Sequence, residues 1–314
     1  MLRRGNKIVD MDYQSIIENI YQEVLQNENQ GAVASYIPEL AKVNPDQFGV
    51  CLQTLDNAEY GIGDWQTKFS IQSISKVLSL SLAYKLVGGE LWERVGVEPS
   101  GNAFNSLVQL ETDNGIPRNP LINAGAMVIC DFLISHTQDA KAEFLNFIRK
   151  ICANSQIDYS ESIANSEKSV GYLNIALCNF LKSFGNIKND PEEVLEFYFH
   201  MCSIEMTCQE LTRTFMFLAN DEFRTPEGEE VLGIKQAIRI NAIMQTCGFY
   251  DESGDFSFRV GLPGKSGVGG GILALHPNKY CIAVWSPKLN AKGNSSRGMQ
   301  FLELFTNRTS SSIF

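Results

Sequence analysis

The sequence predicts an α/β fold of the α+β type, in which helices flank one mainly antiparallel sheet and an all-helical lobe is inserted into it. Apolar residues form short runs of strand length near both ends of the chain, whereas in the middle they recur with helical spacing. Strands and helices do not alternate, as they would around a parallel sheet. These patterns divide the chain into a discontinuous sheet lobe, 1–72 and 226–314, and a helical lobe, 73–225, and we expect a ligand site in the cleft between them.

The N-terminal part of the chain carries signals for one helix and two strands. A helix is expected to begin after its N-cap, Asp12, and to end near Gly31. Two extended runs, 48–55 and 65–71, predict strands. The glycines of 61–63 between them predict a turn.

The middle of the chain carries helix signals, which are apolar periodicity, N-cap residues and one capping box. They predict helices that begin at Ser73, after Asp190, after Thr207 and after Gly233. Towards the C-terminus the spacing returns to two, and alternation over 256–260 predicts a strand. Apolar runs at 269–275 and 280–285 predict two more strands, and a final helix is expected over 298–305.

Composition excludes several classes of function. The 314 residues carry a formal net charge of −10, whereas a nucleic-acid-binding surface needs clustered Lys and Arg. No apolar stretch approaches the ~20 residues of a membrane-spanning helix. The basic start at 1–7 is followed by Asp10 and Asp12 in place of an apolar signal core. Because the eight cysteines are scattered and form no C-x-x-C pair, these features predict a cytoplasmic protein without nucleic-acid or membrane partners.

Residues for metal or nucleotide chemistry are scarce. The three histidines, His136, His200 and His276, form no H-E-x-x-H motif, and no cysteines are paired at ligand spacing, so no metal site is expected. The same scarcity, and the lack of a G-x-S-x-G elbow, argues against a Ser-His-Asp or Cys-His mechanism. Gly264-Lys265-Ser266 is similar to the end of a phosphate-binding loop, but Arg259 stands where that motif needs its first glycine.

Ser73-Ile74-Ser75-Lys76 is the only S-x-x-K in the chain. It lies where an extended run passes into a helix, so Ser73 and Lys76 share a helical face and the lysine can reach the serine hydroxyl. The start of the helix also offers backbone N–H groups to a developing oxyanion. Taken alone, the motif more often marks a Ser N-cap followed by a lysine in solvent.

A second motif strengthens the first. Lys265-Ser266-Gly267 begins a glycine-rich segment beyond the helical block. In serine enzymes of the β-lactamase and penicillin-binding type, S-x-x-K is accompanied by K-T-G on a strand at the edge of the site, and here serine keeps the hydroxyl of that threonine. Glycine lets a strand backbone approach a substrate closely. Together the two motifs favour a serine nucleophile over an incidental lysine on an edge strand.

Further segments occur in an order typical of one family. They are Tyr36-Ile37-Pro38-Glu39-Leu40, Gln72-Ser73-Ile74-Ser75-Lys76, Glu98-Pro99-Ser100-Gly101, Asn119-Pro120-Leu121-Ile122-Asn123-Ala124-Gly125-Ala126, Ser166-Glu167 with Asn174, Phe197-Tyr198-Phe199, Gly261-Leu262-Pro263 before Lys265-Ser266-Gly267-Val268, and Trp285-Ser286-Pro287. With them the chain, from about residue 30 to 300, resembles the serine-dependent glutaminases, which have a β-lactamase-like fold.

The resemblance implies hydrolysis of L-glutamine to L-glutamate and ammonia without a metal or organic cofactor, by a homodimer or homotetramer. It implies that Ser73 is the nucleophile and Lys76 its activating base, with Tyr36 and Tyr250 beside them. The backbone of Val268 would complete an oxyanion hole with that of Ser73. The implied substrate-binding residues are Ser73, Gln72, Asn123, Glu167, Asn174, Tyr198, Tyr250 and Val268, supported by Lys265, Ser266 and Gly267.

These residue types suit the reaction. A lysine of ordinary pKa, about 10.4, is protonated at neutral pH, so Lys76 needs burial or a second cation, such as Lys265, to become a base. Tyr250 could relay a proton to the departing ammonia. Glu167 can pair with the substrate ammonium, while the amides of Asn123 and Asn174 can hold its carboxylate.

Two alternatives remain open at this point. The S-x-x-K and K-S-G motifs alone equally allow a β-lactamase or a peptidase of the same fold, although those substrates lie outside the cytoplasm. The chain could also be a catalytically silent protein that binds amino acids. Without the resemblance, Glu167 would be expected in a solvated loop and Tyr198 in the core.

Overall fold

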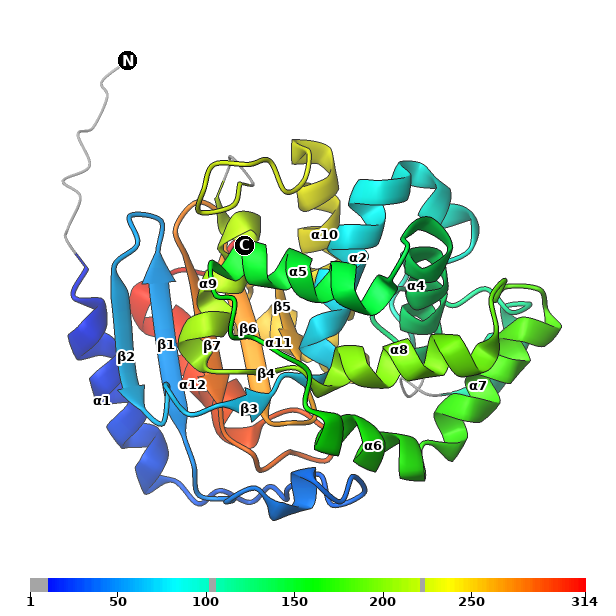
Figure 1. The fold of residues 1–314 in the computed structure, drawn as a ribbon. Helices are drawn as coiled ribbons and strands as arrows, with labels where there is room; N and C mark the ends of the chain where they lie inside the picture. Colours follow the sequence, from blue (N-terminus) through cyan, green and yellow to red (C-terminus); the bar gives the residue numbers. More distant parts are fainter. Residues whose placement is uncertain (1–10, 102–105, 221–223) are drawn as a thin grey trace.

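A five-stranded antiparallel sheet, in the order β2–β1–β7–β6–β5, lies on one side of the protein (Figure 1). The computed structural model describes residues 11–101, 106–220 and 224–314, so the basic start at 1–7 lies outside it. A separate two-stranded pair joins β3 to β4. The strands are β1 (Gly49–Thr54), β2 (Glu59–Gly63), β3 (Phe69–Ser70), β4 (Glu205–Met206), β5 (Gly264–Ser266), β6 (Gly271–His276) and β7 (Tyr280–Trp285).

Helices cover the sheet and fill the rest of the molecule, and α4, α6, α7 and α8 gather on the side away from α1 and β2 (Figure 1). The helices are α1 (Tyr13–Gln26), α2 (Ser75–Val87), α3 (Leu107–Thr112), α4 (Asn123–His136), α5 (Ala140–Cys152), α6 (Glu161–Val170), α7 (Tyr172–Ser183), α8 (Pro191–Ser203), α9 (Cys208–Ala219), α10 (Ile234–Cys247), α11 (Ser253–Arg259) and α12 (Ser296–Thr309), with short 3₁₀ helices η1 (Leu40–Lys42), η2 (Gln72–Ile74), η3 (Gly88–Glu93) and η4 (Tyr250–Glu252).

Helix starts with a local signal are where the sequence predicts them. The side chain of Asp12 caps α1, although this helix ends at Gln26, before Gly31. Asp190 caps α8, whose first residue is proline. At α9 both hydrogen bonds of the capping box form between Thr207 and Glu210.

The central strands alternate between two hydrophobic cores. In β7, Ile282 and Val284 pack with α1 and α12 on one face of the sheet. Ala283 and Trp285 point to the other face, where the core continues through α9 into the helical segment. Burial on both faces explains why this strand is a continuous apolar run rather than an alternating one.

Two predictions for the first sheet strands are wrong in part. Residues 61–63, predicted as a turn, belong to β2, where Gly61 pairs with Cys51. Glycine at position 61 allows the Trp65 ring to pack closely against the strand, because a Cβ there would lie 2.4 Å from the ring. The predicted strand 65–71 shrinks to Phe69–Ser70, because Asp64 and Thr67 form a turn before it.

The strand predicted over 256–260 is also wrong, because these residues form the end of α11 and the turn after it. Phe256 and Val260 are both fully buried, and their separation of four residues places them on one helical face. Phe258, between them, is 89% exposed. The spacing of the buried residues 256 and 260 therefore fits a strand or a helix, and in the structure they pack in the core beside the sheet as part of a helical turn.

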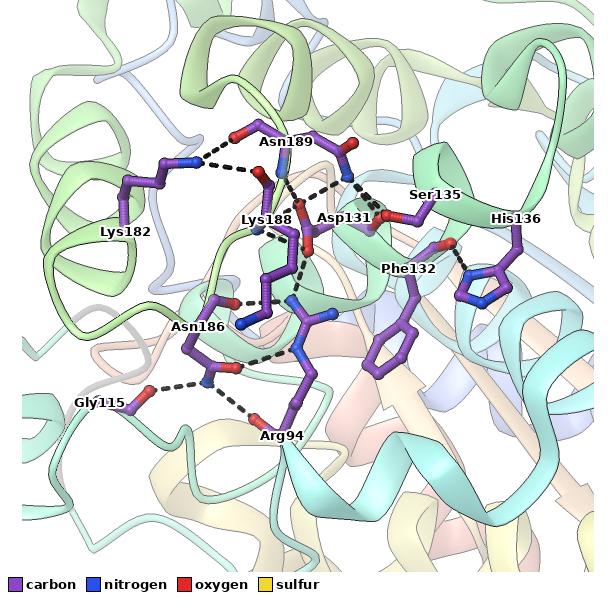
Figure 2. A network of polar contacts seen from close by, with 10 residues as sticks. All are labelled: Arg94, Gly115, Asp131, Phe132, Ser135, His136, Lys182, Asn186, Lys188 and Asn189. Carbon is purple, nitrogen blue, oxygen red and sulfur yellow. Dashed lines mark hydrogen bonds and ion pairs between the residues drawn. The ribbon is translucent and has the colours of Figure 1, made fainter.

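A buried carboxylate network ties α4 to its neighbours (Figure 2). Asp131, on α4, accepts hydrogen bonds from the backbone N–H groups of Lys188 and Asn189, at 3.0 and 2.8 Å, and pairs with the guanidinium of Arg94. Burial alone would raise the pKa of Asp131, but these hydrogen bonds lower it below its ordinary value. Asn186 joins the network to the backbone carbonyl of Gly115 at 2.8 Å.

Substitution of Asp131 by alanine is expected to destabilise the fold by about 3–5 kcal/mol, because it leaves the Arg94 charge and two backbone N–H groups without their acceptor. The thermal midpoint of unfolding should fall accordingly. As a control, Asp255→Ala removes a carboxylate from an exposed ion pair with Arg259 and should leave the midpoint nearly unchanged. Equal midpoints for the two variants would contradict a stabilising role of the network.

Candidate active site

Ser73 lies in η2, at the point where the chain enters α2, and is 9% exposed. The preceding residue, Gln72, has a left-handed backbone with φ of 48°, which is rare outside glycine. The turn after β5 packs directly on this segment, since a Cβ on Gly267 would lie 2.4 Å from the carbonyl oxygen of Ile71. Glycine at 267 therefore allows the K-S-G segment to lie against the serine-bearing turn.

Lys76 lies one turn further along and is fully buried. Its Nζ donates to Oδ1 of Asn123 at 2.6 Å, and the Asn123 amide donates in turn to Asn174 at 2.9 Å. Burial lowers the pKa of Lys76 to about 8, although the negative charges that Cys202 and Glu167 can carry act in the opposite direction. Three helices, α2, α4 and α7, thus contribute to one chain of polar contacts.

Lys265 is the second cation that the sequence suggests beside Lys76. Lys265 is fully buried on β5, and burial together with the charge of Lys76 holds its own pKa well below the ordinary value. Burial is the largest cause of the shift at Lys76 itself. The two lysines therefore lie close enough for their charges to interact.

Tyr250 joins the site from η4 with a left-handed backbone, φ 58°, and is 6% exposed. Burial raises the pKa of its hydroxyl to about 12, and hydrogen bonds with Ser73 and then Ser266 partly offset this effect. The nucleophile predicted from S-x-x-K and a tyrosine outside any short motif therefore lie close together.

Glu167 projects from α6 and is 7% exposed, in contrast to the solvated loop acid that its sequence context alone predicts. Burial raises its pKa to about 7, while Lys76 and a hydrogen bond with Gln72 lower it. Its Oε2 has no hydrogen-bond partner within the described part of the chain. A buried carboxylate oxygen without a partner can bind a positively charged group of a ligand.

The remaining predicted residues lie around this cluster. Tyr198, on α8, is 2% exposed, and the Lys76 Nζ lies 5.7 Å from its ring centroid. Tyr36 is 57% exposed overall, yet burial of its hydroxyl, with smaller effects of Tyr250 and Glu167, raises its pKa. The chain next to Tyr36 packs against Val268, in a small cluster with Ile37 and Leu40.

The backbone N–H groups of Ser73 and Val268 donate to no backbone carbonyl among the residues that the structure describes. Both residues are buried, at 9% and 7% exposure. Contacts between β5 and η2 bring the two segments together. Buried N–H groups are normally paired, so two that are free of backbone partners are suited to bind an anionic oxygen.

Two contributors to this region carry no sequence signal. Cys202 is buried and lies near Lys76 and Glu167; burial raises the pKa of its thiol, and interactions with Tyr198 and Ser75 partly offset this effect. Ser70 accepts a hydrogen bond from the Gln72 amide at 2.9 Å. Both residues reach the site through tertiary packing, and no spacing in the sequence could have singled them out.

The described residues contain no group of three or more His, Cys, Asp or Glu side chains placed to hold a metal ion. Among the same residues, no helix is both long and apolar enough to cross a membrane.

A family model described as Glutaminase matches residues 31–314. The chain belongs to the glutaminase family. A glutaminase of Christiangramia forsetii is 54% identical over 304 residues, which cover 97% of this chain and 100% of the relative. One from Agrobacterium fabrum is 50% identical over 305 residues, covering 96% and 99%. Family membership, and with it a hydrolase that acts on the amide of glutamine, is confirmed.

Solved structures agree with this assignment. The probable glutaminase ybaS has a TM-score of 0.90 at 34% identity and covers 96% of this chain and 97% of its own. A probable glutaminase of Bacillus subtilis has a TM-score of 0.84 at 31% identity, with 96% of each chain covered. Mglu, described in a glutamate form, has a TM-score of 0.90 at 29% identity and covers 97% and 70%. The predicted β-lactamase-like fold is therefore confirmed.

Proposed function

We propose that this glutaminase hydrolyses L-glutamine to L-glutamate and ammonia through an acyl-enzyme on Ser73. The observation that carries the proposal is the buried pair of Ser73 and Lys76 on one helical face, with an amine whose pKa is about 8. A carboxamide is a poor electrophile, and a serine ester divides its hydrolysis into two easier steps. The description of Mglu in a glutamate form supports binding of the product by this fold.

In the first step the Ser73 Oγ attacks the side-chain carbonyl carbon of glutamine, and Lys76 takes the hydroxyl proton. The N–H groups of Ser73 and Val268 stabilise the oxyanion. The C–N bond then breaks, and ammonia leaves with a proton from the Tyr250 hydroxyl, which Lys76 restores by passing on the proton that it took from Ser73; the pKa of about 12 keeps this hydroxyl protonated at neutral pH. In the second step water attacks the ester and gives a proton to Lys76. Lys76 then returns this proton to the Ser73 Oγ as the ester bond breaks and glutamate leaves.

Substrate recognition uses both ends of the amino acid. Glu167 pairs with the ammonium group through Oε2, which has no hydrogen-bond partner among the described residues. The amides of Asn123 and Asn174 and the hydroxyl of Tyr198 hold the carboxylate, while Gln72 orients Glu167. Tyr36 closes the site from its more exposed side. These groups come from both the sheet segments and the helical segment 73–225, so we place the substrate between the two lobes.

Release of glutamate by the purified protein, measured with and without phosphate, tests the proposal. Turnover of glutamine, with no hydrolysis of a chromogenic cephalosporin, is expected. Cephalosporin turnover without glutamate release would support the β-lactamase alternative instead. Thermal stabilisation by glutamine without ammonia release would indicate a silent binding protein. Size-exclusion chromatography with light scattering tests the homodimer or homotetramer that the family resemblance implies.

The value of kcat/KM is expected to rise with pH through about 7 and again through about 8, because Glu167 is charged, and Lys76 neutral, only above their respective pKa values. Glu167→Gln should remove the lower step and raise KM. The rise in kcat/KM that reports Lys76 should also move to lower pH in this variant, since the Glu167 charge raises the pKa of Lys76. A parental profile that is flat over this range would contradict both assignments.

A further inference from the structure

Lys265 has an unusual set of neighbours for a buried lysine. Its Nζ donates to the carbonyl oxygens of Gly248, at 3.0 Å, and Ser266, at 2.7 Å. It also lies 4.2 Å from the centroid of the Tyr250 ring. None of the ion pairs found among the described residues includes Lys265, and buried lysines are rare without such a partner. Its contacts are therefore with the Tyr250 turn and with its own strand.

Contacts with neighbouring segments hold the turn that carries Tyr250 in its conformation. Tyr250 has a left-handed backbone, which a bulky residue keeps only where its surroundings impose it. Gly248 presses against β5, because a Cβ there would lie 1.8 Å from the carbonyl oxygen of Gly264. The Ser266 amide also donates to the Gly248 carbonyl, at 3.3 Å, and Ser253 donates to the Tyr250 carbonyl at 3.1 Å.

We propose that Lys265 is a positioning residue, which ties the Gly248 carbonyl to β5, packs against the Tyr250 ring and so holds the Tyr250 hydroxyl at Ser73. The lysine of K-S-G then acts through Tyr250 and not as a cation beside Lys76. The lowered pKa of Lys265 agrees with this role, since hydrogen-bond donation to two carbonyls does not need a full charge. The inference rests on the proposed function only through the role of Tyr250 in proton transfer.

A double-mutant cycle with Lys265→Met and Tyr250→Phe tests the proposal. Methionine keeps the length of the side chain but cannot donate to Gly248. We expect Lys265→Met to lower kcat by about 100-fold through misplacement of the hydroxyl, with KM largely unchanged. In the Tyr250→Phe background it should cause little further loss, because the group that it positions is already gone. Lys292→Met, which removes an exposed lysine paired with Asp251 in the same turn, should keep parental kcat.

Losses that multiply in the double variant would overturn the proposal, and so would parental kcat in Lys265→Met. If Lys265→Met does not fold, Lys265→Gln, which retains an N–H donor near Gly248, replaces it in the same cycle. A crystal structure of the folded variant gives a readout independent of activity. We expect a displaced Tyr250 hydroxyl there, and an unmoved one would overturn the proposal. A parental protein that releases no glutamate would instead contradict the proposed function.

Discussion

Substitution of Ser73 by alanine is expected to lower kcat for glutamine by about 10⁴–10⁶-fold, the range seen when a serine hydrolase loses its nucleophile. The side chain is small and 9% exposed, so its loss should leave the fold intact. Glutamate release under saturating glutamine is the measurement. The residual activity should be only the rate enhancement that the oxyanion-binding N–H groups and the substrate-binding residues provide without a nucleophile.

Ser81→Ala is the matched control for this prediction. Ser81 lies on α2, the helix that follows the Ser73 turn, is fully buried, and donates to the carbonyl of Val77 at 2.7 Å. It should retain parental kcat. Near-parental turnover by Ser73→Ala would show that another group attacks the amide, whereas equal losses in both variants would indicate damage to α2 as a whole.

Substitution of Lys76 by methionine should be almost as damaging as loss of the serine, because an unassisted hydroxyl is a weak nucleophile. The amine also donates to Asn123 at 2.6 Å, so KM should rise as well. Added to Ser73→Ala, Lys76→Met should cause little further loss, since the two groups act as a unit. The measurement is kcat for the single and double variants, alongside circular dichroism to confirm folding.

Lys85→Met is the control for Lys76→Met. Lys85 lies at the other end of α2, is exposed, and donates to the carbonyl of Glu230 at 3.1 Å. It should keep parental activity. If Lys76→Met reduced kcat only a few-fold, or if its effect multiplied with that of Ser73→Ala, Lys76 would not be the activating base and Tyr250 would become the first candidate.

The sequence by itself determined the features that depend on neighbouring residues. The caps at Asp12, Asp190 and Thr207 mark helix starts because their side chains bond to backbone groups two or three residues away. Ser73 and Lys76 are paired by helical spacing alone. The family resemblance, carried by segments from about residue 30 to 300, indicated the fold class and the reaction before any tertiary contact was known.

The tertiary structure decided whatever depends on contacts between distant segments. Packing made 256–260 helical and placed 61–63 in a strand, since both patterns are locally ambiguous. Burial of Glu167 and the lowered pKa of Lys76 arise from several helices packing around them. The left-handed turn at Tyr250 and its tie to Lys265 join η4 to β5. Desolvation and long-range hydrogen bonds set these properties, and neither has a signature in local sequence.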